Sequence, residues 1–149
     1  MVAIKHILIA ALVVFAILIV AGCVDNSERD SAQEKYDQQI ITTNEQLSVV
    51  QNLYDRFSLG VDIVSLKEIM PRYYSNLTAL QNDVNASIQA GEELKKYLKQ
   101  DSDDYETVTA NELSLQTQFN LFVRDYNQHV ESYNNGPGLQ DGTTMPLFT

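Results

Sequence analysis

Hydrophobic residues recur along most of the chain at the spacing of an α-helix. From Tyr36 onward most fall three, four or seven positions apart, which places them on one face of a helix. No segment alternates with the period of two that is typical of a β-strand. Three hydrophobic stripes result: Tyr36, Ile40, Leu47, Val50, Tyr54 and Phe57; then Tyr73, Leu77, Leu80, Val84, Ile88, Leu94 and Leu98; then Val108, Leu115, Phe119, Phe122, Tyr126, Val130 and Tyr133.

The stripes predict three long helices with short connections between them. Their expected bounds are residues 31–59, 72–100 and 104–134. Helices of this size are about 43–47 Å long, and matched lengths with short connections are typical of an up-down-up bundle. We therefore expect an all-α fold, an antiparallel three-helix bundle over residues 36–135. The turn at 60–71 and the C-terminal tail would then lie at the same end.

Residues 62–70 predict a short extra helix that reverses the chain. The preceding helix is expected to end at Leu59-Gly60, because glycine is the usual left-handed residue after a helix. Ser65 and Glu68 have the spacing of a capping box. Pro71 biases the residue before it away from helical backbone and suits the first turn of a helix. The second long helix is therefore expected to start at this proline.

Two further positions give expectations about packing and helix ends. Gly91 lies on the apolar face of the second stripe, where a mid-helix glycine costs about 1 kcal/mol relative to alanine. It predicts that a neighbouring helix approaches closely at that point. The run Asp101-Ser102-Asp103-Asp104 interrupts the pattern, and its side chains suit the N-cap of the third helix.

The same acidic run also invites comparison with a calcium-binding loop. Asp101 and Asp103 stand at positions 1 and 3 of such a loop and Glu112 at position 12. Position 6, however, is Glu106, where an EF-hand loop needs glycine for its sharp turn. An acidic helix N-terminus is the better interpretation, and we expect no metal site and no cofactor.

The N-terminus carries the longest uninterrupted hydrophobic run. Residues 7–21 are apolar, follow Lys5, and lead directly into Gly22 and Cys23, the only cysteine. A basic start, an apolar middle and small residues at the end are typical of a secretory signal peptide. The stretch Ile19-Val20-Ala21-Gly22-Cys23 resembles the lipobox of prokaryotic lipoproteins. That resemblance implies removal of residues 1–22 and a diacylglyceryl group on Cys23.

Membrane attachment has two interpretations. Two acyl chains anchor a protein stably, so lipidated Cys23 would hold the domain on the outer side of the cell membrane. Alternatively, residues 7–24 remain as a transmembrane helix of about 27 Å, slightly short of a hydrocarbon core of about 30 Å. In both cases the acidic flank after the run lies outside the cytoplasm.

The remaining segments and the composition complete the domain organisation. Residues 23–35 are predicted to be a polar tether that merges into the first helix. Residues 136–149 are predicted to be a flexible tail whose Met145–Phe148 segment either docks on the bundle or stays loose. After residue 22, nine basic residues face twenty acidic ones, a formal charge of −11. This charge argues against nucleic acid as a partner. Without a second cysteine, disulfides and cysteine metal sites are excluded.

Few side chains suggest a specific site. His129 is the only histidine after the signal segment and has no companion ligand, so we expect it at the edge of the stripe. Asn76 and Asn85 each begin an N-glycosylation sequon, and Asn85 is the better acceptor because it falls on the outer face. Tyrosines either belong to the core or form a partner-binding row; the ones on or beside the stripes are Tyr36, Tyr54, Tyr73, Tyr97, Tyr126 and Tyr133.

The segment Arg124–Asn134 contains a Tyr-Asn pair repeated after seven residues, at 126–127 and 133–134. With Arg124 and Val130 it resembles the late helix of the LemA family. The resemblance implies a prokaryotic protein with an N-terminal membrane segment followed by a long helical bundle, and it implies no catalytic residue.

Together these features favour a membrane-anchored, extracytoplasmic lipoprotein with a non-enzymatic helical interaction or scaffold domain. The alternative is a single-pass, LemA-like accessory subunit of a membrane complex. A small-ligand binder is less favoured, because no cluster of titratable residues lies on an apolar face. A protein partner or self-association as a coiled coil is expected.

Overall fold

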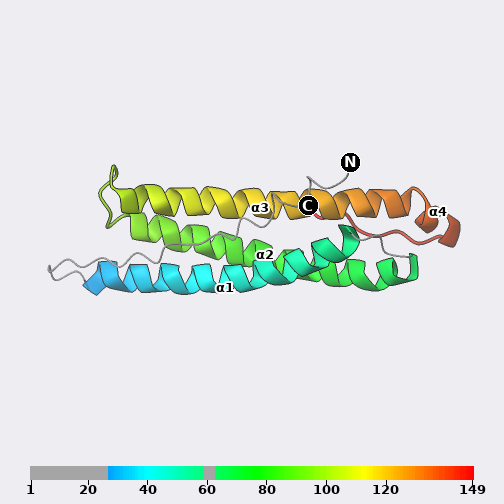
Figure 1. Cartoon of the computed structure of the whole chain (residues 1–149), viewed down its shortest axis with the longest axis horizontal. Coiled ribbons are helices and arrows are strands. Elements are labelled where there is room, and N and C mark those ends of the chain that lie inside the picture. Colours follow the sequence, from blue (N-terminus) through cyan, green and yellow to red (C-terminus); the bar gives the residue numbers. More distant parts are fainter. Residues whose placement is uncertain (1–26, 59–62) are drawn as a thin grey trace, which may run out of the picture.

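The computed structural model describes residues 27–58 and 63–149, which form a rod of three long antiparallel helices and one short helix (Figure 1). The helices are α1 (Ser27–Ser58), α2 (Ile63–Lys95), α3 (Asp103–Asn134) and α4 (Pro137–Asp141). The predicted all-α three-helix bundle with a short extra helix is confirmed. The predictions for Cys23 and for a helix end at Leu59-Gly60 lie outside the described residues.

The core follows the predicted stripes. α2 packs against both α1 and α3, which contact each other much less. Fully burying one large apolar side chain stabilises the fold by roughly 1.5–3 kcal/mol, so this core provides most of the stabilisation. Its largest completely enclosed apolar and aromatic side chains are Tyr73, Tyr126, Phe122, Met70, Leu77, Leu80, Leu94, Leu115, Val50, Val108 and Val130.

The predicted helix break at Pro71 is wrong. α2 runs without interruption from Ile63 to Lys95 and contains Pro71, so residues 63–70 are its first turns and not a separate helix. Proline inside a helix costs about 3 kcal/mol. Ile69 and Met70 are only 4% and 1% exposed. Burying two such side chains recovers roughly 1.5–3 kcal/mol each, which outweighs the cost of the proline. The short extra helix of this fold is α4.

α1 begins earlier than the sequence suggested. Residues 27–30, which precede the expected helix start at residue 31, also belong to the helix, so the tether assigned to 23–35 is wrong from residue 27 onward. Ala32 is buried, and Arg29 pairs with Asp104 at the start of α3, with Nη2 3.7 Å from Oδ2. Glu28 and Asp30 in the first turn also stabilise the start of the helix, because negative side chains interact favourably with the N-terminal end of the helix dipole. Packing against the other two helices therefore extends α1 into its polar flank.

The connection between α2 and α3 is only partly as expected. Ser102 is the N-cap of α3, and its Oγ accepts the Tyr105 N–H at 3.3 Å, as the polar run predicted. α2, however, ends at Lys95, and residues 96–98 form a turn and a bend. The expected helix end at residue 100 is therefore wrong.

Gly91 lies at a close approach of α2 and α3, as predicted. A Cβ atom at this position would lie 3.0 Å from Val108 Cγ1 and would meet the carboxylate of Glu112. The missing side chain therefore makes room for a buried valine and a buried acid on α3.

Thr43 and Ser87 form a polar layer inside the α1–α2 interface. Both are completely buried, and their hydroxyl oxygens are 2.8 Å apart. Thr43 Oγ1 also lies 2.9 Å from the Gln39 carbonyl oxygen and 3.1 Å from that of Asp83. A buried hydroxyl without a partner is costly, so this layer favours one register between the two helices.

Thr43→Val is expected to lower the free energy of unfolding by roughly 1–2 kcal/mol, because it leaves the Ser87 hydroxyl without its threonine partner. Adding Ser87→Ala should recover part of that loss, because the double variant has no buried hydroxyl without a partner at position 87. Urea denaturation of the single and double variants measures both effects. Thr42→Val, at an exposed position, is the matched control. Equal losses at positions 42 and 43 would contradict a role for the buried layer.

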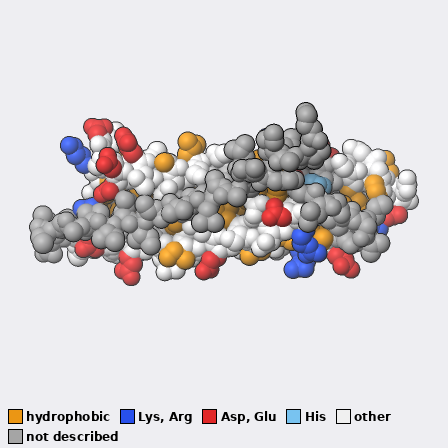
Figure 2. Space-filling model, in the orientation of Figure 1, with side chains coloured by type: hydrophobic (Ala, Val, Ile, Leu, Met, Phe, Trp, Pro, Cys, Tyr) orange, Lys and Arg blue, Asp and Glu red, His pale blue; other side chains and the backbone are white. Residues whose placement is uncertain are grey.

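Acidic side chains are spread along the described part of the face shown in Figure 2, with basic side chains mostly toward the ends.

Large hydrophobic residues that remain exposed lie on several different elements; they are Ile41, Val49, Tyr97, Leu113, Leu139 and Leu147. Scattered single residues of this kind are normal on a protein surface. Self-association as a coiled coil stays a prediction.

Candidate functional site: the groove that holds the C-terminal tail

The C-terminal tail is packed against the bundle. After α4 the chain turns at Gly142, whose φ is 65°, and then runs back along α3 (Figure 1). Phe148, one residue from the end, is only 6% exposed. The prediction of a flexible tail over 136–149 is therefore wrong, and the docked alternative for residues 145–148 describes the structure. Burial of an aromatic ring and hydrogen bonds to α3 outweigh the entropy of a free tail.

Two asparagines on α3 hold the backbone of this tail. Asn134 accepts the Met145 N–H through Oδ1 at 2.8 Å and donates from Nδ2 to the Met145 carbonyl at 2.9 Å. Asn127 binds Phe148 in the same way, at 2.8 and 3.0 Å. Each amide side chain thus satisfies both polar groups of one tail residue, as a neighbouring strand would.

Aromatic side chains of α2 and α3 surround Phe148. Its ring centroid lies 5.2 Å from that of Tyr74 and 5.9 Å from that of Phe119. Tyr126 donates its hydroxyl to the Pro146 carbonyl oxygen at 3.1 Å. The Tyr-Asn repeat noted in the sequence therefore supplies both asparagines and one of these tyrosines. Its role in binding the tail was not predicted, because the partner segment is distant in the chain.

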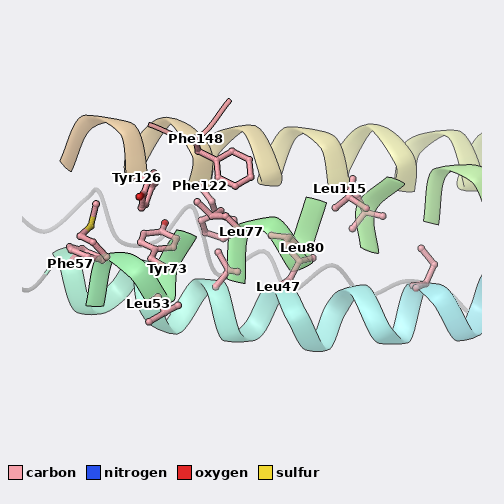
Figure 3. Packing of buried hydrophobic residues seen from close by; sticks show 14 of the residues in the cluster. Leu47, Leu53, Phe57, Tyr73, Leu77, Leu80, Leu115, Phe122, Tyr126 and Phe148 are labelled. Atoms are coloured by element: carbon pink, nitrogen blue, oxygen red, sulfur yellow. The ribbon is translucent and has the colours of Figure 1, made fainter. Parts of the chain in front are cut away.

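Behind the groove lies an aromatic cluster in the core (Figure 3). Tyr73 stacks on Phe57 with centroids 5.4 Å apart and meets Tyr126 edge to face at the same distance. Burial raises the pKa of the Tyr126 hydroxyl to about 12 and that of Tyr73 still further. Both hydroxyls therefore stay neutral near pH 7 and act as hydrogen-bonding groups.

His129 lies at the edge of the stripe, as predicted, beside an acidic residue. Its Nδ1 is 2.8 Å from the Asp125 carbonyl oxygen and 3.6 Å from Asp125 Oδ2, and its ring packs 4.9 Å from that of Phe57. Tyr73 donates a long hydrogen bond of 3.5 Å to the same carboxylate. Burial raises the pKa of Asp125, while His129 and the Tyr73 hydrogen bond lower it. His129 and Asp125 therefore contact the aromatic cluster at Phe57 and Tyr73.

A second feature that the sequence did not predict is a buried ion pair between α2 and α3. Lys95 Nζ lies 2.5 Å from Glu112 Oε2, and the two side chains are only 9% and 11% exposed. Lys95 also pairs with Glu92 at 3.0 Å and lies 5.5 Å from the centroid of the Tyr105 ring. Burial raises the pKa of Glu112, while the hydrogen bond and the charge of Lys95 lower it.

The two candidate glycosylation sites differ in exposure. Asn85 is exposed, whereas Asn76 is half-buried. The Asn76 amide donates to the Arg72 carbonyl oxygen at 2.7 Å and accepts from Gln46 at 3.1 Å. In the Asn85 sequon the hydroxyl residue, Ser87, is completely buried. Sugar addition at Asn85 stays a prediction.

The tyrosines of the stripes are mostly core residues. Tyr97 is 39% exposed and Tyr54 is partly buried, and the other four are buried; these are Tyr36, Tyr73, Tyr126 and Tyr133. Tyr36 accepts a hydrogen bond from Asn111 at 3.2 Å, and burial raises its pKa to about 12. A surface row of six tyrosines is therefore not formed.

Surface hollows lie along the first turns of α1 and are lined by exposed polar residues such as Asp30, Lys35 and Gln38. Within residues 27–58 and 63–149, no three histidine, cysteine or acidic side chains are grouped to hold a metal ion. No helix in these two ranges has the length and apolar character that a membrane span needs.

No protein family model, curated protein or solved structure matches the chain. The resemblances to lipoproteins at Cys23 and to the LemA family at residues 124–134 therefore stay predictions.

Proposed function

We propose that this protein is a membrane-anchored, extracytoplasmic helical bundle with a non-enzymatic role, which holds an interaction surface away from the membrane. The observation that carries this proposal is how few residues separate Cys23 from the first residue of the rod. α1 begins at Ser27, only four residues beyond that cysteine. Four residues span at most about 14 Å, so a lipid on Cys23 would keep the start of α1 near the membrane.

The length of the rod then sets the height of its other end. α1 has 32 residues, which corresponds to about 48 Å at 1.5 Å per residue. The Arg29–Asp104 pair marks the end near the membrane, and the exposed pair between Lys67 and Asp141 marks the far end. The tail groove therefore occupies the outer half of the rod, where a partner approaches without contacting lipid.

The charge of the domain supports the same arrangement. A formal charge of −11 after residue 22 repels anionic lipid headgroups, which keeps the bundle from lying flat on the bilayer. Acidic side chains along the face in Figure 2 are consistent with a domain that is solvated over its length.

Mass spectrometry of the protein from its native membrane tests the anchor. We expect an N-terminus at Cys23 that carries a diacylglyceryl group. Cys23→Ser should abolish the lipid and either release the protein or leave the signal segment uncut, because no thiol remains to accept lipid. The far-UV circular dichroism of the bundle should not change.

Ser27→Ala, at the exposed first residue of α1, is the matched control and should be lipidated normally. An intact Met1 on the wild-type protein would contradict the lipoprotein proposal. That result would favour the alternative, a transmembrane accessory subunit with residues 7–24 retained.

A further inference from the structure

The groove between α2 and α3 has the dimensions of a site for an extended peptide. Asn127 and Asn134 are seven residues apart, which is about 10.5 Å along a helix axis. Met145 and Phe148, which they bind, are three residues apart, and an extended chain covers about 10 Å over three residues. Two helical turns therefore match three extended residues, and both amides engage the peptide backbone at once.

Most of the polar contacts in the groove are independent of the sequence of the bound segment. Asn127 and Asn134 bind only N–H and carbonyl groups, and Tyr126 donates to a carbonyl. Every extended peptide offers such groups, although the residue at the Pro146 position needs no free N–H. In a general mode of peptide recognition, hydrogen bonds to the peptide backbone provide affinity, and pockets for alternate side chains provide specificity.

The apolar side-chain contacts are restricted to two positions of the bound segment, and Thr143 adds one hydroxyl contact of 2.8 Å to Tyr133. Phe148 is buried between the rings of Tyr74 and Phe119, and Met145 is partly buried against the core. Leu147, between them, is 43% exposed, and Thr144 is exposed. The groove thus selects an apolar residue followed three positions later by phenylalanine.

The tail reaches this groove through a short connection, which is held to α3 by the buried Gly138 and by a hydrogen bond of 2.8 Å between the hydroxyls of Tyr133 and Thr143. α4 is only five residues long, and Gly142 turns the chain with a positive φ. The Lys67–Asp141 pair is exposed on both sides, and such pairs contribute little. The groove itself is lined by residues of α2 and α3, and these two helices also contact each other directly along their lengths. Exchange of the tail for another segment requires that the groove persists when the tail leaves it.

We infer that the α2–α3 groove is a binding site for an extended segment of a partner protein that carries an apolar residue and, three positions later, phenylalanine. The C-terminal tail is its resident ligand and occupies the groove until such a segment displaces it. The groove lies entirely in the described helices, so the inference does not depend on how the chain is attached to the membrane.

A labelled copy of the tail tests this inference. The probe is a fluorescent peptide of sequence Gly-Thr-Thr-Met-Pro-Leu-Phe-Thr, and its binding to the full chain in detergent micelles is followed by fluorescence anisotropy. A tethered tail competes at an effective concentration on the order of millimolar. We therefore expect the peptide to bind at least tenfold more tightly to the Phe148→Ala chain than to the wild-type chain.

Leu147→Ala is the matched control, because this neighbouring side chain is exposed, and its chain should bind the peptide as weakly as wild type. In the Phe148→Ala background, Asn127→Asp should weaken binding at least tenfold, because it removes the donor to the Phe148 carbonyl. A peptide with alanine in place of phenylalanine should not bind.

Several results would overturn the inference. They are equal binding by the wild-type and Phe148→Ala chains, unchanged binding after Asn127→Asp, and binding of the alanine peptide. A wild-type dimer in light scattering that the Phe148→Ala change dissociates would instead show tails exchanged between two copies. If Asn127→Asp fails to fold, the side-chain amide NMR signals of Asn127 and Asn134 in the Phe148→Ala chain serve in its place. They should shift when peptide is added, and the absence of a shift would contradict the inference.

Discussion

Tyr73→Ala is expected to lower the free energy of unfolding by about 4 kcal/mol, because truncating a large buried aromatic side chain leaves a cavity. Tyr73 is completely buried on α2, between Phe57 of α1 and Tyr126 of α3. Removing its ring therefore loosens all three helices at the point where they meet. Urea denaturation followed by circular dichroism at 222 nm measures the loss.

A second variant at this position separates the ring from its hydroxyl, and an exposed tyrosine serves as the control. Tyr73→Phe keeps the packing and removes only a long hydrogen bond of 3.5 Å to Asp125, so its effect should be below about 1 kcal/mol. Tyr97→Ala, at a 39% exposed position, should cost about 0.5 kcal/mol or less. If Tyr73→Ala cost no more than Tyr97→Ala, the aromatic cluster would not be the centre of the core.

Lys95→Met is expected to lower the free energy of unfolding at pH 7 by roughly 3 kcal/mol, the lower end for breaking a buried ion pair. The reason is that Glu112 would keep its negative charge in a site that is 11% exposed, without its cation. Lys96→Met is the matched control. Lys96 is the next residue, pairs with Glu93 and is well exposed, so its loss should have no measurable effect.

The loss in the Lys95→Met variant should depend on pH. Burial already raises the pKa of Glu112, and removing Lys95 removes the contacts that lower it. A carboxyl whose pKa is higher in the folded state binds more protons there, so stability falls as pH rises from its ordinary pKa of 4.5 through the folded value. The variant should therefore recover stability relative to wild type as the pH is lowered toward 4.

Combining Lys95→Met with Glu112→Gln tests the cause. The double variant has no buried charge, so it should regain most of the lost stability at pH 7 and lose the added pH dependence. Urea denaturation at pH 4 and pH 7 provides two free energies of unfolding for each variant and two for the wild type. A double variant as unstable as Lys95→Met would show that lost packing of the lysine chain, and not charge, is responsible.

Much of the bundle was predictable because its signals are local. The spacing of Tyr36, Ile40 and Leu47 defines an apolar face without reference to the rest of the chain. Ser102 was recognisable as an N-cap because its bond to Tyr105 spans only three residues. Gly91 predicted a close neighbour because glycine destabilises a helix, so its presence on an apolar face indicates that another helix needs the space.

The errors arose where a distant contact outweighed a local preference. Pro71 is a strong local breaker, but the burial of Ile69 and Met70 against the bundle keeps α2 continuous. The polar residues at the start of α1 carry no hydrophobic stripe, yet the helix includes them and Arg29 pairs with Asp104 of α3. Neither contact can be inferred from residues that are close in the sequence.

The candidate site divides in the same way. The Tyr-Asn repeat was visible in the sequence, but its partner, the tail around Phe148, follows 21 residues after Asn127 and reaches it only through the turn at Gly142. Glu112 and Lys95 come together because α2 and α3 are antiparallel across the Gly91 contact.

The sequence by itself determined the helical class, the core-facing residues of each helix and the candidate anchor at Cys23, because periodicity and motifs act over a few residues. Only the tertiary structure decided that α2 packs between α1 and α3, that Pro71 lies inside a helix and that the tail fills a groove. These outcomes depend on free energy gained by burying surfaces from distant segments against one another, which no local pattern encodes.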